Sequence, residues 1–160
     1  MKWIIYPTCI FISAALLFCT KKQGKNPSLA YTDSALLDSC KVEKLFYYKE
    51  DPNSLLSGTA GPHGTFKLRF NSIAYQALSE NGKLPQGDKF PDGSLVVKDV
   101  YQGGSISLYA LMYKRAGSWL WAEIEPGGSV HFSVNKNSST CTGCHSQAGN
   151  RDLVLSFNFY

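Results

Sequence analysis

Two cysteines and a histidine near the C-terminus form the most chemically distinctive pattern in the chain. The run Cys141-Thr142-Gly143-Cys144-His145 places two thiols three positions apart, and an imidazole directly follows the second thiol. This spacing is typical of covalent attachment of a c-type haem. Each thiol then bonds one vinyl group of the porphyrin, and the histidine ligates the iron. We therefore expect one covalent haem c, held by Cys141 and Cys144, with His145 as the proximal iron ligand.

Two other chemistries also use a Cys-x-x-Cys pair. A structural zinc site needs a second pair of ligands, and the sequence has no other close pair of cysteines or histidines to supply it. A redox dithiol of the thioredoxin type accompanies a βαβ pattern, which the sequence around Cys141 does not show. Haem attachment is therefore the favoured interpretation of this motif.

The first 18 residues have the pattern of an export signal. Lys2 precedes an apolar run over residues 3–18, which is shorter than the roughly 20 residues that a membrane span needs. The end of the run, Leu16-Leu17-Phe18-Cys19, resembles a bacterial lipobox, although Phe18 stands where a small residue is usual. We therefore expect a lipoprotein signal peptide over 1–18 and lipidation of Cys19. A plain signal peptide and an uncleaved anchor are the alternatives.

Export defines the expected organisation of the rest of the chain. The polar residues 19–30 suit a tether, and residues 31–160 have the length of one domain. The predicted location is the periplasmic side of the cell envelope or the outer membrane, where the lipid would anchor the protein. The formal net charge is +4, and no dense basic stripe is present, so we expect no nucleic-acid partner.

Hydrophobic periodicity predicts an α+β fold, predominantly an antiparallel β-sheet with two or three short helices. Helices are expected over 33–50, capped by Thr32 or Asp33, and over 72–80, capped by Asn71 and ended by Gly82. The remaining Cys40 should be a small buried residue of the first helix. Alternating or apolar runs joined by short Gly-containing links predict strands over 65–70, 94–101, 105–115, 119–125, 129–134 and 153–160.

The ordered motifs resemble the cytochrome P-460 family, including its relatives without a crosslink, the β-sheet cytochromes c′ (cytochrome c′-beta). The resemblance covers about residues 40–160. It rests on a short helix after Asn71 and on four runs: Gly61-Pro62-His63-Gly64, Phe90-Pro91-Asp92-Gly93-Ser94, the haem motif itself, and Asp152-Leu153-Val154. The resemblance implies a mainly antiparallel β fold with one c-type haem ligated by His145. It also implies that the protein is often a homodimer.

The resemblance implies two competing activities. Cytochrome P-460 proper oxidises hydroxylamine and uses a lysine crosslinked to the porphyrin with a carboxylate that handles protons. The c′-beta relatives bind nitric oxide or carbon monoxide in an apolar pocket without turnover. A third hypothesis is an electron carrier that serves a redox partner protein. Met112 is the only methionine beyond the signal segment. It lies in an apolar strand where core packing is expected, so an open iron face is favoured.

Lys98 is the first candidate for a crosslinking lysine. Such a lysine must be partly desolvated so that its neutral amine is a nucleophile. Val96 and Val100 flank Lys98 on its face of the predicted strand, and Lys114 beside Met112 is the second candidate. An ordinary solvated strand lysine is the open alternative for each of them.

Glu123 is the candidate proton acceptor. It shares a strand face with Trp121 and Glu125, and a carboxylate beside an indole is expected to have a raised pKa. The open alternative is that both carboxylates lie at the solvated end of the strand. His63 and His131 are further candidates for contact with a ligand or with the haem propionates, although such histidines more often hold a loop by hydrogen bonds.

Overall fold

The computed structural model describes residues 31–58 and 61–160. The predicted signal segment 1–18, the predicted lipidation site Cys19 and the tether 19–30 lie outside the described residues. No helix within the described ranges is long and apolar enough to cross a membrane.

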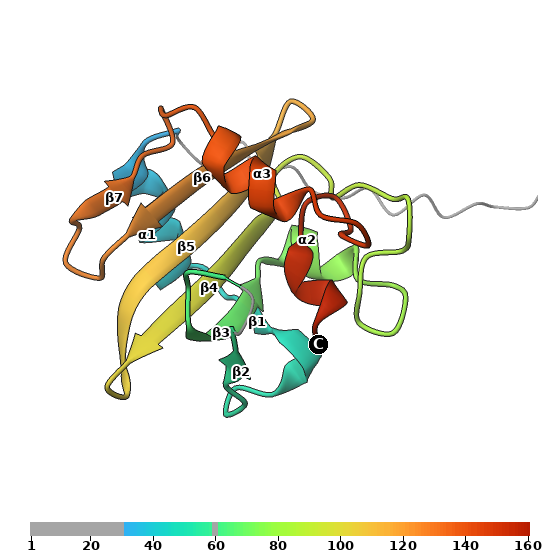
Figure 1. The fold of residues 1–160 in the computed structure, drawn as a ribbon, viewed down its shortest axis with the longest axis horizontal. Coiled ribbons are helices and arrows are strands. Elements are labelled where there is room, and N and C mark those ends of the chain that lie inside the picture. The colour runs from blue at the N-terminus through green and yellow to red at the C-terminus, as the bar shows by residue number, and fades with distance from the viewer. Residues whose placement is uncertain (1–30, 59–60) are drawn as a thin grey trace, which may run out of the picture.

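The fold is α+β, as the hydrophobic pattern predicts, and combines a mostly antiparallel seven-stranded sheet with three α-helices (Figure 1). Two short 3₁₀ helices, η1 and η2, complete it. In chain order the elements are α1 Asp33–Val42, β1 Phe46–Tyr47, η1 Tyr48–Glu50, β2 Leu56–Ser57, β3 Thr65–Phe70, α2 Ser72–Gln76, β4 Leu95–Gln102, β5 Ser105–Arg115, β6 Ser118–Ile124, β7 Val130–Phe132, α3 Ser139–His145 and η2 Leu155–Asn158.

The predicted meander forms the centre of the sheet. The strand order is β1-β3-β4-β5-β6-β7, and the short strand β2 also pairs with β3. The hairpin between β4 and β5 turns through Gly103 and Gly104, which both have positive φ (58° and 84°). Two such residues in succession match the right-handed twist of the flanking strands, so this two-residue link joins neighbouring antiparallel strands.

The alternation of side chains divides the interior into two clusters, one on each face of the sheet. In Figure 1, α1 lies behind the sheet, whereas α3 and the C-terminal segment lie in front of it. The cluster on the α1 face includes Leu36, Leu37, Leu95, Val97, Leu111 and Ile124. The cluster on the α3 face includes Phe66, Phe70, Val96, Met112, Trp121 and Phe157.

Two helix starts follow the predicted capping. The Thr32 hydroxyl accepts a hydrogen bond from the backbone N–H of Ala35, at 3.1 Å, and begins α1. The Asn71 side chain accepts from Ala74 N–H at 3.0 Å and also from Leu95 N–H at 3.0 Å. Asn71 therefore begins α2 and ties it to β4. Cys40 is buried in α1, as predicted, and burial raises the pKa of its thiol to about 12.

The first helix is much shorter than predicted. It ends at Val42 rather than at Glu50, and the Val42 side chain is 80% exposed. Residues Phe46 and Tyr47 are extended and pair with Phe70 and Arg69 of β3. The predicted helix is therefore divided mainly between α1 and β1, because pairing with the sheet overrides the local helical pattern.

The predicted last strand, 153–160, is wrong. Asp152 and Leu153 have positive φ (48° and 66°), a conformation that cannot begin a strand, and residues Leu155–Asn158 form η2. Leu155 and Phe157 are buried all the same. The apolar residues of this segment thus pack against the sheet without joining it.

Two further boundaries differ from the prediction. The second helix ends at Gln76 rather than at residue 80, and Gly82 instead belongs to a tight turn in which Glu80 and Lys83 bridge. The strand predicted over 129–134 is limited to β7. Strand β2, which is only two residues long, is not predicted from the sequence.

Candidate functional site

Helix α3 carries the predicted haem-attachment motif. Cys141 and Cys144 are both half-buried free thiols, and residues three positions apart lie on the same side of a helix. The Thr142 hydroxyl donates to the carbonyl of Ser138 at 3.0 Å and stabilises the first turn. The helix therefore presents both sulfurs and the side chain of His145 on one short, regular element.

The ring of His145 has a defined tautomer. Its Nδ1 lies 2.7 Å from the carbonyl oxygen of Leu153, and a carbonyl only accepts, so Nδ1 carries the proton and donates. Burial lowers the pKa of His145 to about 4, which keeps the ring neutral at pH 7. Nε2 therefore keeps its lone pair, as a metal-ligating histidine requires. The ring packs edge-on against Trp121, with centroids 4.6 Å apart.

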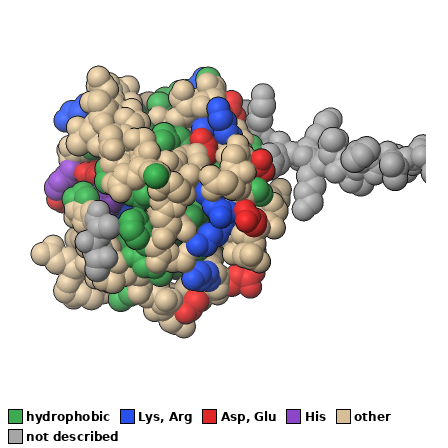
Figure 2. Space-filling model, turned by 45° about the vertical axis from the view of Figure 1, so that its right-hand side comes forward, with side chains coloured by type: hydrophobic (Ala, Val, Ile, Leu, Met, Phe, Trp, Pro, Cys, Tyr) green, Lys and Arg blue, Asp and Glu red, His purple; other side chains and the backbone are tan. Residues whose placement is uncertain are grey.

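Cys141, Cys144 and His145 line a partly open cavity of about 320 Å³ between α3 and the sheet. This volume lies within the range of about 300–1,000 Å³ that is common for cofactor sites. In Figure 2, hydrophobic side chains are exposed in the middle of one face of the molecule. Apolar side chains from successive strands form most of the wall, among them Phe66, Leu68, Val96, Met112, Trp121 and Phe132.

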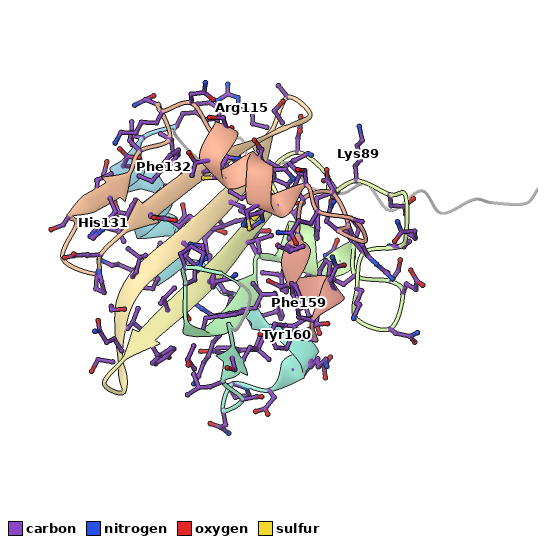
Figure 3. The ribbon with its side chains drawn as sticks, in the orientation of Figure 1. Lys89, Arg115, His131, Phe132, Phe159 and Tyr160 are labelled. Carbon is purple, nitrogen blue, oxygen red and sulfur yellow. The ribbon has the colours of Figure 1, made fainter. Side chains whose placement is uncertain are left out.

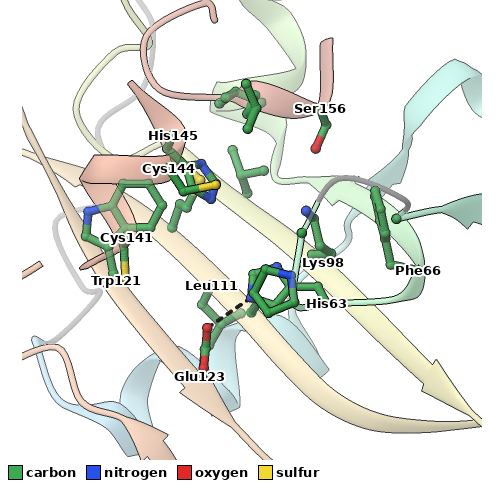
Figure 4. A pocket seen from close by; sticks show the side chains of 18 of the residues that line it. His63, Phe66, Lys98, Leu111, Trp121, Glu123, Cys141, Cys144, His145 and Ser156 are labelled. Carbon is green, nitrogen blue, oxygen red and sulfur yellow. Dashed lines mark hydrogen bonds and ion pairs between the residues drawn. The ribbon is translucent and has the colours of Figure 1, made fainter. Parts of the chain in front are cut away.

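Lys98 projects from β4 into the wall of this cavity (Figure 4). Its Nζ lies 4.2 Å from the centroid of the Phe66 ring, and it has no hydrogen bond or ion pair with any residue that the structure describes. Burial lowers the pKa of Lys98 to about 8, because an apolar wall disfavours the charged amine. Lys98 is therefore partly buried rather than solvated, as its apolar neighbours on the strand suggested.

Glu123 and His63 form a pair at the same cavity. His63 Nε2 lies 2.9 Å from Glu123 Oε1. Glu123 belongs to β6, whereas His63 belongs to a loop 60 positions earlier in the chain. The hydrogen bond with His63 lowers the pKa of Glu123. The raised pKa that the sequence suggested is therefore wrong, because the histidine that faces the carboxylate stabilises its charged form more than burial disfavours it.

The other candidates lie outside the cavity. His131 pairs with Glu125 at 2.6 Å, and both side chains are largely exposed (53% and 43%). Figure 3 shows His131 on β7 at the edge of the sheet, away from α3. Lys114, the second candidate for a crosslink, is buried against Asp152, with 2.9 Å between Nζ and each carboxylate oxygen. The structure therefore brings Lys98, Glu123 and His63 to the motif and leaves Lys114, Glu125 and His131 elsewhere.

Trp121 contributes a polar group that sequence reasoning missed. Its Nε1 is buried and has no hydrogen-bond partner among the described residues, and its ring lines the cavity. A buried donor without a partner is costly. The strand pattern placed Trp121 on the same face as Glu123, but the missing partner is visible only in the folded chain.

The C-terminal segment also lines the cavity, which the predicted strand concealed. Ser156, Phe159 and Tyr160 lie in its wall. The Tyr48 hydroxyl donates to the carbonyl of Tyr160 at 2.9 Å, and the Tyr160 hydroxyl donates to that of Ser57. The end of the chain is thus held against the first loops of the domain.

A haem c fits the residues around this cavity. Two free thiols, an imidazole with an available Nε2 and apolar side chains line one space. The donor set of two thiols and one imidazole is smaller than a structural zinc site needs. Among residues 31–58 and 61–160, no cluster of three or more His, Cys, Asp or Glu side chains suits a metal ion.

Comparison of the chain with models of protein families, with curated proteins and with solved structures finds no match.

Proposed function

We propose that the protein is a c-type monohaem protein of the cytochrome P-460 type that oxidises hydroxylamine or a related small nitrogen species. Cys141 and Cys144 would hold the haem, and Nε2 of His145 would ligate its iron. When bound, the haem supplies a coordination site for the substrate and a route for its electrons.

One observation carries this proposal. The attachment motif, the amine of Lys98 and the His63–Glu123 pair line one apolar cavity, although they come from α3, β4, β6 and a loop. Three ionisable groups around an apolar cavity are the usual setting of acid–base chemistry. An ordinary core at this place would need none of them.

The protein groups have separable roles in this proposal. The apolar wall excludes water from the bound substrate. The Glu123 carboxylate accepts a proton from the substrate, and His63, whose Nε2 lies 2.9 Å from Oε1, holds the carboxylate in place. Lys98 supplies an amine whose pKa is lowered to about 8, so a neutral, nucleophilic fraction is present at pH 7–8. The resemblance implies that such a lysine forms the porphyrin crosslink.

A second candidate function is the binding of nitric oxide or carbon monoxide without turnover. The apolar lining contributed by Phe66, Leu68 and Phe132 favours it, because a neutral diatomic ligand needs no proton acceptor. A redox partner protein, lipid anchoring through Cys19 in the cell envelope and a homodimer complete the proposal. They rest on the sequence alone.

Hydroxylamine oxidation with an artificial electron acceptor tests the proposed function. We expect turnover by the full chain and a loss of about 10²–10⁴-fold in Glu123→Gln, as for removal of a general base. Glu125→Gln is the matched control, since Glu125 lies on the same stretch of chain but pairs with His131 outside the cavity. It should keep wild-type turnover.

The optical spectrum separates the candidate functions. A red-shifted Soret band that is lost in Lys98→Met would indicate the crosslink. Tight binding of nitric oxide without hydroxylamine turnover would contradict the enzyme and favour the binding protein. A low-spin spectrum of the His/Met type in the ferrous protein would contradict both and favour an electron carrier with Met112 on the iron.

A further inference from the structure

We propose that the buried Lys114–Asp152 ion pair positions His145 for the iron by holding the backbone segment whose carbonyl fixes the histidine tautomer. This proposal rests on the proposed function in one respect, which is that His145 is the ligand. All the contacts that link Lys114 to His145 are made between groups of the protein itself.

The ion pair is the first of these contacts. Lys114 Nζ lies 2.9 Å from both carboxylate oxygens of Asp152, and the two side chains are 3% and 9% exposed. The backbone N–H of Phe90 donates to the same carboxylate at 2.9 Å. The Nε1 of Trp119 donates to the Asp152 carbonyl at 2.8 Å. Three separate parts of the chain therefore converge on Asp152.

These contacts hold residues 152–153 in an unusual backbone conformation. Asp152 has a φ of 48° and Leu153 a φ of 66°, which non-glycine residues rarely adopt, least of all a bulky leucine. The Asn150 side chain accepts from Leu153 N–H at 2.8 Å and holds the segment from its other end. A strained segment persists only where its surroundings determine it, and the Asp152 contacts are those surroundings.

The carbonyl of Leu153 links this segment to His145. The strained segment directs the Leu153 carbonyl at His145 Nδ1, 2.7 Å away. If the segment relaxes, the acceptor for Nδ1–H is lost, and a neutral imidazole can then carry its proton on either nitrogen. A proton on Nε2 blocks the atom that would ligate the iron. Outer groups that orient a ligand histidine commonly act in this way.

A second ion pair provides the matched control. On the opposite face of the sheet, Arg69 donates from Nε and Nη2 to the Asp99 carboxylate at 2.6 Å, and Asp99 is 2% exposed. This pair is buried to a similar degree, but it contacts α1 and not the 152–153 segment. Its loss should disturb the fold without altering His145, whereas the loss of Lys114–Asp152 should do both.

The experiment measures the tautomer of His145 by long-range ¹H–¹⁵N NMR. It uses the full chain at pH 7, prepared without attached haem, as wild type and as two double variants. The test variant is Lys114→Met with Asp152→Asn, and the control is Arg69→Met with Asp99→Asn. We expect the Nδ1–H form to dominate in the wild type and the control. In the test variant, the ratio of the Nδ1–H to the Nε2–H form should fall at least tenfold.

A milder variant keeps the proposal testable if the double variant does not fold. Trp119→Phe removes only the donor to the Asp152 carbonyl and keeps an aromatic ring, so the tautomer ratio should shift in the same direction by a smaller factor. A wild-type tautomer ratio in a folded variant, whether the double variant or Trp119→Phe, would overturn the proposal. So would an equal shift of the ratio in the Arg69–Asp99 control.

Haem staining of the denatured wild-type chain keeps this test separate from the proposed function. If no haem is retained, the proposed function fails, yet the tautomer measurement still decides whether the ion pair positions His145. If haem is retained, the iron–histidine stretching band in the ferrous resonance Raman spectrum should move in the test variant and not in the control. An unmoved band in the test variant would also overturn the proposal.

Discussion

The two faces of β4 treat a buried charge in opposite ways. Asp99 points to the α1 face, where two nitrogens of Arg69 meet its carboxylate at 2.6 Å. Lys98, its neighbour in sequence, points to the cavity face, where its amine lies over Phe66 and has no ion-pair partner among the described residues. The α1 face is complete as a protein core, whereas the cavity face holds polar groups that the chain itself does not satisfy. Such groups are expected where a ligand completes the site.

The largest effect should come from breaking the pair on the α1 face. Arg69→Met leaves the Asp99 carboxylate buried, 2% exposed, without its partner. Removal of one member of a buried ion pair destabilises a protein by about 3–5 kcal/mol. Urea unfolding of the haem-free chain measures the effect. Adding Asp99→Asn to the same variant should restore most of the loss, and a loss below about 1 kcal/mol in Arg69→Met would show that water reaches this site.

Replacing the unpartnered Lys98 on the cavity face should stabilise the protein, whereas Arg69→Met destabilises it. Lys98→Met should stabilise the haem-free chain at pH 7 by up to about 3 kcal/mol, because the fold lowers the pKa of this amine from 10.5 to about 8. The folded chain binds fewer protons than the unfolded chain between these two pH values. The stability of the wild type should therefore rise between about pH 8 and pH 10.5.

The pH profile of unfolding checks this prediction. Lys98→Met should remove the rise in stability above about pH 8, where the wild-type amine loses its proton. A destabilised Lys98→Met variant with an unchanged profile would contradict the unpartnered state of the amine. The buried charges on both faces of the sheet would then each have a stabilising partner.

The smallest effect is expected at Glu123, whose carboxylate is 31% exposed beside His63. Its pKa is lowered in the fold, so its contribution is present above the unfolded value near 4.5 and is lost as the pH falls through the folded value. Glu123→Gln should therefore cost less than about 1 kcal/mol near pH 7. It should also flatten the acid limb of the stability profile, and a steeper acid limb would contradict the hydrogen bond with His63.

Local sequence patterns predicted the centre of the sheet, including the strand that carries Lys98. The alternation in β3 and the Gly-rich links around β5 depend on neighbouring residues alone. The flanking Val96 and Val100 favour a partly desolvated Lys98 but leave a solvated strand lysine open, and only the folded chain places Lys98 in the cavity wall.

The features that could not be predicted from the sequence depend on contacts between residues far apart in the chain. The apolar residues of 153–160 alternate as in a strand, but positive φ at Asp152 and Leu153 prevents pairing with the sheet. The low pKa of Glu123 depends on His63, which is 60 positions away. No local pattern indicates either the partner of Glu123 or the contact of Lys114 with Asp152.

The intact mass of the denatured full chain shows whether haem is covalently attached to α3. The chain should be produced in a host that attaches c-type haem, and its mass should be measured beside that of the Cys141→Ser, Cys144→Ser variant. We predict that one haem remains on the denatured wild-type chain and none on the variant. A wild-type chain without haem, or a variant that retains it covalently, would rule out attachment through Cys141 and Cys144.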